Sequence, residues 1–131
     1  MFMNMAAPLI PNSPQELNVK RIEAVIRPER LELLRVRLEE VGYPGIMVSE
    51  IKGHGKQRGV SHQWRGTEYK EYFLPKTRVE LIVKDSQVKP LVDAIIEVCR
   101  SKAVGDGKIF ITNVEDSVRI RTGETGDVAL T

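Results

Sequence analysis

Alternating apolar and polar residues mark the strands of this chain. In residues 21–27, Ile22, Ala24 and Ile26 fall on one face, which is the period of a strand with one buried side. Similar runs predict strands over residues 45–52, 77–84 and 108–114, and a short fifth strand over residues 118–121.

Two segments between these strands repeat their apolar residues at helical spacing. Pro28 suits the first turn of the first helix, and Gly42 predicts its end. Asp85 or Ser86 is expected to cap the second helix. The predicted buried positions are Leu31, Leu34, Leu38 and Val41 in the first helix and Val88, Leu91, Val92, Ile95 and Val98 in the second.

The elements follow in the order strand, helix, strand, long loop, strand, helix, strand. This order predicts an α+β fold of the ferredoxin-like βαββαβ type, with one antiparallel sheet and two helices on one of its faces. The other face is expected to carry Glu23, Val25, Glu80 and Ile82. Because an uncovered and partly apolar sheet face favours self-association, we expect an oligomer.

The long polar segment over residues 53–76 is where we expect binding. Its four glycines are expected to interrupt regular structure, and five basic residues are interleaved with four aromatic ones. A small domain rarely has a loop of this length unless the loop is functional or disordered. Loops carried by a rigid scaffold are frequent binding sites.

Length, charge and composition limit the class of protein. The 131 residues suit one domain, and a net charge of +2 is too small to require a nucleic acid or an anionic membrane as partner. The single cysteine, Cys99, excludes an internal disulfide and favours a reducing, cytoplasmic compartment. Residues 1–18 show no periodicity and are expected to be a flexible extension before a domain over residues 19–131.

Two basic motifs indicate an anionic ligand. Residues 105–108 (GDGK) combine two glycines, whose N–H groups can face an anion, with the cation of Lys108. Arg119 and Arg121 are expected on one face of an extended segment, where two guanidinium groups suit a polyphosphate or a carboxylate. Taken singly, each motif also has a purely structural explanation. Residues 105–108 fit a plain turn with a solvated lysine, and Arg119 and Arg121 fit a charged edge strand. Together they support a nucleotide-like ligand.

Other reactive residues give weaker signals. His54 and His62 lack partners at metal-ligand spacing, and Cys99 on the apolar side of the second helix is expected to be buried. No nucleophile with a base is recognisable, so we expect no enzyme. RNA-recognition modules share this order of elements but stack bases on aromatic residues of their central strands. The corresponding strands here have none, which makes nucleic-acid binding a weaker alternative.

Three motifs resemble signatures of the PII nitrogen-regulatory signal proteins. Residues 64–69 (WRGTEY) resemble the modification-loop signature of that family, residues 105–110 (GDGKIF) its nucleotide-binding signature, and residues 119–124 (RIRTGE) its C-terminal signature. The motifs occur in the family's order and spacing, and the resemblance extends from about residue 19 to about residue 129.

The resemblance implies a homotrimer of ferredoxin-like subunits with ATP or ADP bound in the clefts between subunits. It implies 2-oxoglutarate beside MgATP as a second ligand. The long loop, here about residues 55–75, would dock on an ammonium channel or on nitrogen-assimilation enzymes and regulators. Contact with a membrane would then be indirect, through a channel partner.

The resemblance also implies roles for individual residues. Nucleotide contacts are implied for Gly53, Gly55, Lys56, Gln57, Glu80, Ile82, Gly105, Asp106, Gly107, Lys108, Arg119 and Arg121. Contacts to 2-oxoglutarate are implied for Arg27, Gln57, Arg58, Gly59, Lys76 and Gly105, and Gln57 is also implied to help hold Mg²⁺. Tyr69 corresponds to the tyrosine that many bacterial members have uridylylated, and Thr67 to a position that is phosphorylated where it is serine.

Two residues at the loop base depart from the family pattern. Lys56 stands where arginine is usual, and His54 stands where an aromatic residue is usual. These departures leave open a sensor of adenine nucleotides alone, without a response to 2-oxoglutarate. A plain oligomeric interaction module, in which the basic residues are only surface charge, is the other alternative.

Overall fold

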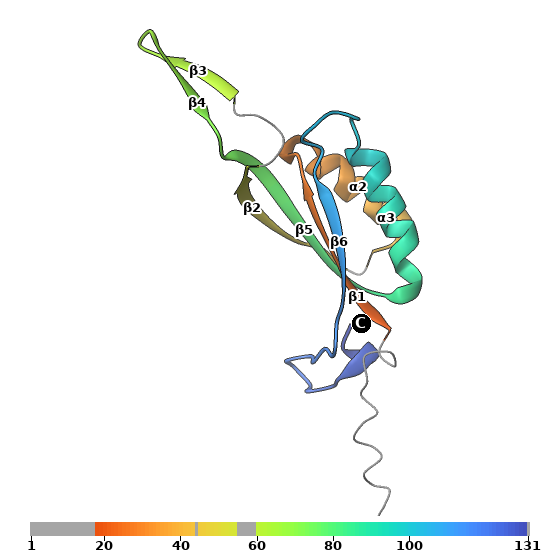
Figure 1. Cartoon of the computed structure of the whole chain (residues 1–131). Coiled ribbons are helices and arrows are strands. Elements are labelled where there is room, and N and C mark those ends of the chain that lie inside the picture. The colour runs from red at the N-terminus through yellow and green to blue at the C-terminus, as the bar shows by residue number, and fades with distance from the viewer. Residues whose placement is uncertain (1–17, 44, 55–59, 131) are drawn as a thin grey trace, which may run out of the picture.

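The structure of the chain, a computed structural model, describes residues 18–43, 45–54 and 60–130. The elements run in the order β1 (Val19–Ile26), a short 3₁₀ turn η2 (Pro28–Arg30), α2 (Leu31–Val41), β2 (Met47–Gly53), β3 (Val60–Trp64), β4 (Thr67–Glu71), β5 (Leu74–Lys84), α3 (Asp85–Cys99), β6 (Lys108–Asn113) and η3 (Gly126–Leu130). Figure 1 shows a single layer of sheet with both helices packed on one side of it.

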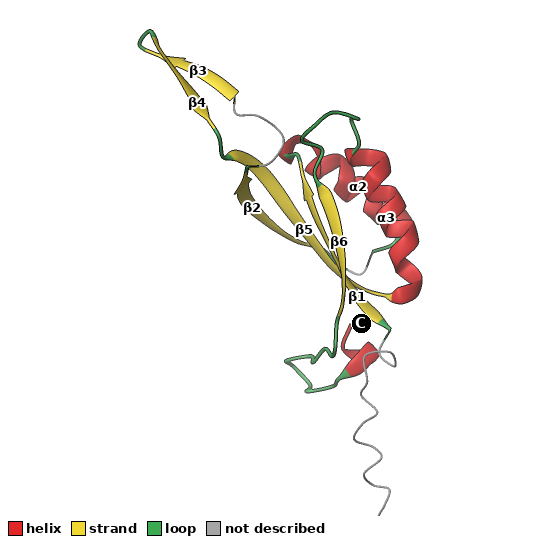
Figure 2. Cartoon of the chain, in the orientation of Figure 1, coloured by secondary structure: helices red, strands yellow, loops and turns green. Residues whose placement is uncertain are grey.

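The main sheet has the strand order β2-β5-β1-β6, with every neighbouring pair antiparallel. In the middle of the sheet Ile22 pairs with Leu81 on β5 and with Ile111 on β6. This is the expected ferredoxin-like α+β arrangement, and the prediction of the fold class is confirmed (Figure 2).

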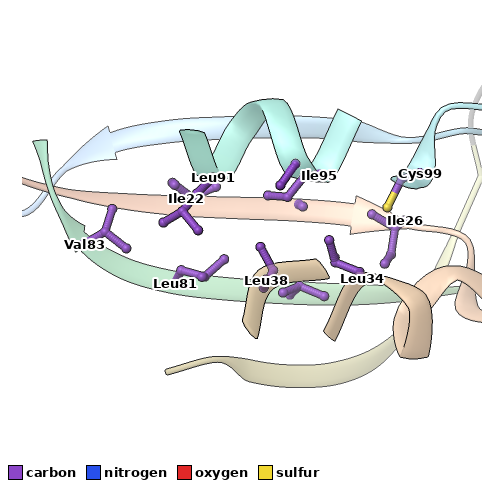
Figure 3. Packing of buried hydrophobic residues seen from close by; sticks show 12 residues of the cluster. Ile22, Ile26, Leu34, Leu38, Leu81, Val83, Leu91, Ile95 and Cys99 are labelled. Carbon is purple, nitrogen blue, oxygen red and sulfur yellow. The ribbon is translucent and has the colours of Figure 1, made fainter. Parts of the chain in front are cut away.

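The core lies between this sheet and the two helices. Ile22 and Leu81 from the sheet are fully buried against Leu38 of α2 and Ile95 of α3 (Figure 3). Cys99 is also buried, as expected, and removal of its thiol from water raises the pKa of the group to about 11. The alternation and the helical spacing therefore identified the face that the core uses.

The helix ends show one agreement and one correction. Gly42 closes α2 in a left-handed conformation with φ of 92°, as its position predicted. The expected cap of the second helix at Asp85 or Ser86 is wrong, because Lys84 is the N-cap and both residues lie in the first turn. The Gln87 side chain instead accepts a hydrogen bond from the Lys84 backbone N–H at 3.0 Å.

Several strand boundaries differ from the prediction. β5 begins at Leu74 rather than at residue 77, because its first residues pair with the end of β2. The expected strand over residues 118–121 is wrong. Val118 makes an isolated bridge with Thr125, and the residues between them form a turn.

The segment expected to lack regular structure contains a β-hairpin. β3 and β4 pair antiparallel from Val60 opposite Glu71 to Trp64 opposite Thr67. Arg65 and Gly66 connect them, both with positive φ (54° and 81°), as a two-residue type I′ turn requires. The hairpin projects from the end of the sheet where β5 begins (Figure 1).

The face of the sheet opposite the helices carries a mixed row of side chains. Met47, Glu80, Glu23 and Phe110 are consecutive partners across the four strands, so their side chains share one face. Arg21 forms ion pairs with Glu23 at 2.9 Å and with Glu80 at 3.1 Å. Met47 and Phe110 are about half exposed (53% and 50%), which leaves apolar surface at both ends of the row.

Candidate ligand-binding site

The loop between α3 and β6, residues 101–107, is organised by the carboxylate of Asp106. This group accepts hydrogen bonds from the backbone N–H of Ser101 at 2.7 Å and of Lys102 at 2.8 Å, and from the Ser101 hydroxyl. These donors, the Ser101 hydroxyl foremost, hold the pKa of Asp106 well below its usual range. The loop is thus fixed around an ionised carboxylate.

Arg27, which follows β1, ties this loop to the sheet. Its Nε donates to Asp106 Oδ1 at 3.3 Å, and its Nη2 donates to the Val104 carbonyl at 2.8 Å. A guanidinium fork that bonds both a carboxylate and a carbonyl fixes its partners in a defined geometry. Arg27 therefore positions the loop as well as adding positive charge beside it.

Gly107 brings the backbone of this loop into close contact with β1. A Cβ atom at this position would lie 1.7 Å from the Val25 carbonyl oxygen, and φ is +100°. Both observations require glycine, since no side chain fits and L-residues avoid this conformation. Gly107 therefore sets how closely the loop packs against β1.

A cavity of about 410 Å³ opens beside this loop. Residues from four segments line it: Val25 of β1, the end of β2, the start of β5, and the loop with the first residue of β6. The predicted site residues among them are Gly53, Lys76, Gly105, Asp106, Gly107 and Lys108, and His54, Leu74 and Val104 complete much of the wall.

Lys76 is held inside this cavity by the loop. Its Nζ donates to the Gly105 carbonyl at 2.8 Å. Partial burial and, next, the nearby charge of Arg27 lower the pKa of Lys76. An acidic group entering the cavity would therefore meet a cation that lies in a partly dehydrated setting and already contacts the loop backbone.

Four other predicted residues, Arg119, Arg121, Glu80 and Ile82, lie away from this cavity. Arg119 and Arg121 follow the far end of β6, and the five residue steps from Lys108 to Asn113 span about 17 Å. Figure 1 shows the cavity loop at one end of β6 and the C-terminal segment at the other. Glu80 and Ile82 lie on the open sheet face. Five predicted residues lie outside the described residues: Gly55, Lys56, Gln57, Arg58 and Gly59.

Arg119 and Arg121 do not share one face of an extended strand, contrary to our expectation. Ile120 to Thr122 form a turn, and Ile120 at its tip is 99% exposed. The backbone N–H of Arg119 donates to the Glu124 carbonyl at 2.8 Å, which closes the turn. Arg119 and Arg121 therefore belong to a compact turn and not to an extended strand.

The hairpin carries the predicted modification positions. Thr67 is exposed at the start of β4, and the backbone of Tyr69 pairs with His62 on β3. Beside the turn, the Arg65 guanidinium lies 5.3 Å from the centre of the Trp64 ring, and that tryptophan is 64% exposed. The end of the hairpin therefore presents an aromatic residue and a cation to solvent.

Two residues that shape this region were not among the predicted ligand contacts. Ser101 shapes the loop through Asp106, and the only sequence signal is a serine five residues before an aspartate. His54 lines the cavity, packs against Tyr72 and Phe73, and places Nδ1 2.9 Å from the Tyr72 carbonyl. These contacts join the two ends of the hairpin segment, which a linear pattern does not reveal.

No group of three or more His, Cys, Asp or Glu side chains is placed to hold a metal ion among the residues that the structure describes. Over the same residues, no helix has the length and apolar character needed to cross a membrane.

Comparison with known proteins decides the family. A family model described as "Nitrogen regulatory protein P-II" matches residues 19–124. The chain belongs to the P-II family. The predicted resemblance is therefore confirmed, and the match contains every residue for which a ligand contact was predicted.

P-II relatives match this chain over almost their whole length. The nitrogen regulatory protein P-II of Rhodobacter capsulatus is 42% identical over 112 residues, which is 86% of this chain and 100% of the relative. Those of Bradyrhizobium diazoefficiens (45% over 108 residues, 82% of this chain and 96% of the relative) and Microchaete diplosiphon (46% over 112 residues, 86% and 100%) are similar. These relatives are named as regulatory proteins, so the chain is a member of a signalling family rather than an enzyme.

Proposed function

We propose that this P-II family protein senses ATP or ADP and, together with MgATP, 2-oxoglutarate. It would regulate targets in nitrogen metabolism through the hairpin segment. The observation that carries the proposal is the convergence of Gly53, Lys76 and residues 105–108 on one cavity. These residues come from segments that are far apart in sequence, and the family match covers all of them.

The loop over residues 101–107 suits the phosphates of a nucleotide. Gly105 and Gly107 both have positive φ, a conformation that residues with side chains rarely adopt, and Gly107 lets the loop pack directly against β1. Lys108 adds a cation at the edge of the same cavity. Backbone N–H groups and a cation together favour a polyanion.

The separation of the cations supports a site shared between subunits. Lys108 and Arg119 lie at opposite ends of β6, so one phosphate chain brings them together when they come from two copies of the chain. The open sheet face, with exposed Met47 and Phe110, offers apolar surface for such an assembly. The proposed assembly is the homotrimer implied by the family, in the cytoplasm.

Arg27 and Lys76 suit the carboxylates of 2-oxoglutarate. Both cations face the cavity loop and bond carbonyl or carboxylate oxygens there, which are positions that ligand carboxylate oxygens can take over. Gln57 is the residue proposed to help hold Mg²⁺ with the ATP phosphates. The metal would neutralise phosphate charge and orient the second ligand.

The hairpin is the proposed docking element. It projects beyond the sheet and starts next to the cavity, where His54 contacts Tyr72 and Phe73. A ligand that changes this base can bias the orientation of the hairpin. An ammonium channel or nitrogen-assimilation enzymes are the proposed partners. Uridylylation of Tyr69, or phosphorylation of Thr67, would change charge and bulk on the docking surface.

Isothermal titration calorimetry with MgATP, with and without 2-oxoglutarate, tests the proposal. We expect ATP binding that tightens in the presence of 2-oxoglutarate, because coupling between two ligands is reciprocal. Lys108→Ala is expected to weaken ATP binding, whereas Lys89→Ala, on the exposed side of α3, is the matched control. ATP binding without coupling would favour the nucleotide-only sensor. No ATP binding would favour the plain interaction module.

A further inference from the structure

The Arg119 guanidinium is already occupied by two acceptors of its own chain. Its Nη1 donates to the Glu124 carboxylate in a close ion pair, and its Nη2 donates to the Val128 carbonyl at 2.6 Å. The Arg119 side chain is 20% exposed, so these contacts take much of its surface. The cation that we propose for phosphate binding is thus held in an intramolecular contact.

Glu124 is itself held in position for this contact. The Thr122 hydroxyl donates to Glu124 Oε1 at 2.8 Å, and the Arg119 and Glu124 backbones are joined across the turn. Ser117 and Gly126 close the base of the same turn through a backbone bond of 3.0 Å. The carboxylate therefore faces Arg119 because the turn is folded, and not through chance contact of two long side chains.

From this arrangement we infer that Glu124 is an internal competitor for the anionic ligand at Arg119 and sets the affinity of that site. A phosphate oxygen forms the same charge-assisted bond with a guanidinium as a carboxylate oxygen does. A phosphate can therefore use Arg119 fully only after Glu124 or the Val128 carbonyl has given up its bond. The inference rests on the proposed function, since it deepens the account of the same nucleotide site.

The competition has a simple consequence for binding. Apparent affinity is reduced by the fraction of subunits in which Arg119 is available to the ligand. Removing the negative charge of Glu124 raises that fraction and must tighten binding. An ion pair with one exposed partner, here Glu124, has a modest strength, so the dissociation constant is expected to fall roughly two- to fivefold.

The test compares Glu124→Gln with Glu115→Gln in the full chain. Both variants remove one negative charge from the same C-terminal segment, and Glu115 is exposed. The probes are MgATP and tripolyphosphate, measured by calorimetry. We expect Glu124→Gln to bind both probes roughly two- to fivefold more tightly than Glu115→Gln, because the competition concerns phosphate and not adenosine.

A double-mutant cycle separates the contact from a general charge effect. In an Arg119→Ala background, Glu124→Gln is expected to give no gain in affinity, because the guanidinium for which Glu124 and the phosphate compete is absent. Equal affinity of Glu124→Gln and Glu115→Gln, or a gain that persists without Arg119, would overturn the inference while leaving the proposed function in place. Loss of ATP binding in every variant and in the wild type would overturn both.

Discussion

Each end of β6 carries a loop built around a carboxylate, and the two carboxylates are used differently. Asp106 accepts bonds from the backbone N–H groups of Ser101 and Lys102, in addition to those from the Ser101 hydroxyl and Arg27. Glu124 accepts bonds from the side chains of Arg119 and Thr122. The first arrangement fixes the path of the chain, whereas the second holds a cation that can change partners.

This difference shows which of the two loops at the ends of β6 is preorganised for the proposed ligand. The loop over residues 101–107 is already held in one shape by the bonds to Asp106 and by the close packing of Gly107 on β1. The Glu124 turn keeps its arginine in an ion pair until a stronger anion arrives. In the two-copy site that we propose, the loop over residues 101–107 would be rigid, whereas the turn that holds Arg119 and Glu124 would change its contacts when the ligand binds.

The largest expected effect comes from a substitution in the loop over residues 101–107. Gly107→Ala places a Cβ 1.7 Å from the Val25 carbonyl oxygen at a φ of +100°, so the backbone must move. We expect the free energy of unfolding to fall by about 3 kcal/mol, from overpacking and the left-handed conformation together. Chemical denaturation measures this value.

Gly123→Ala in the other turn is the matched control for that substitution. It has φ of +77° with no atom within 4 Å of the added Cβ, so only the cost of the conformation remains, about 1 kcal/mol. Equal losses for the two variants would contradict the close approach of residue 107 to β1.

The next largest effect is a loss of folding stability at low pH that arises from protonation of Asp106. Its folded-state pKa lies below the ordinary value of 3.8, so its ionised form stabilises the fold above that pH and the contribution is lost as the pH falls through the lower folded value. We expect the difference in free energy of unfolding between wild type and Asp106→Asn to shrink steadily as the pH falls below about 5. Ser101→Ala, which removes the leading cause of the shift, should show a smaller acid-dependent loss than the wild type.

A smaller effect concerns access to Cys99 next to the rigid loop. The thiol is buried and its pKa is raised to about 11, so little of the reactive thiolate is present at neutral pH. We expect slow labelling by a thiol reagent in wild type, faster labelling in Asp106→Asn, and no change in Glu124→Gln. Fast labelling of the wild type would show that this end of the sheet is open.

The fold could be predicted because its signals are local. Alternation in β1 and the spacing of Leu34 and Leu38 identify faces that the core then uses. Gly42 ends α2 for a reason that is visible in one residue. The β3–β4 hairpin was missed because its strands contain few apolar residues, and its turn is Arg-Gly rather than the stronger Asn-Gly or Asp-Gly signal.

The candidate site could be predicted only in part. Candidate residues were proposed from motifs and from the family resemblance, but their arrangement depends on distances that the sequence does not show. Lys108 and Arg119 are eleven positions apart, yet a strand places them at opposite ends of the sheet. Contacts that tie cations to carbonyl groups, such as Lys76 to Gly105, leave no pattern in sequence because every residue has a carbonyl.

A mixing experiment tests most directly whether the nucleotide site is shared between two copies. Chains with Lys108→Ala and chains with Arg119→Ala are each expected to bind ATP weakly. If they are unfolded together and refolded as mixed assemblies, some interfaces will combine an intact Lys108 from one chain with an intact Arg119 from another. Our account predicts that ATP binding returns in part in the mixture. Binding no stronger in the mixture than in either variant alone would contradict it.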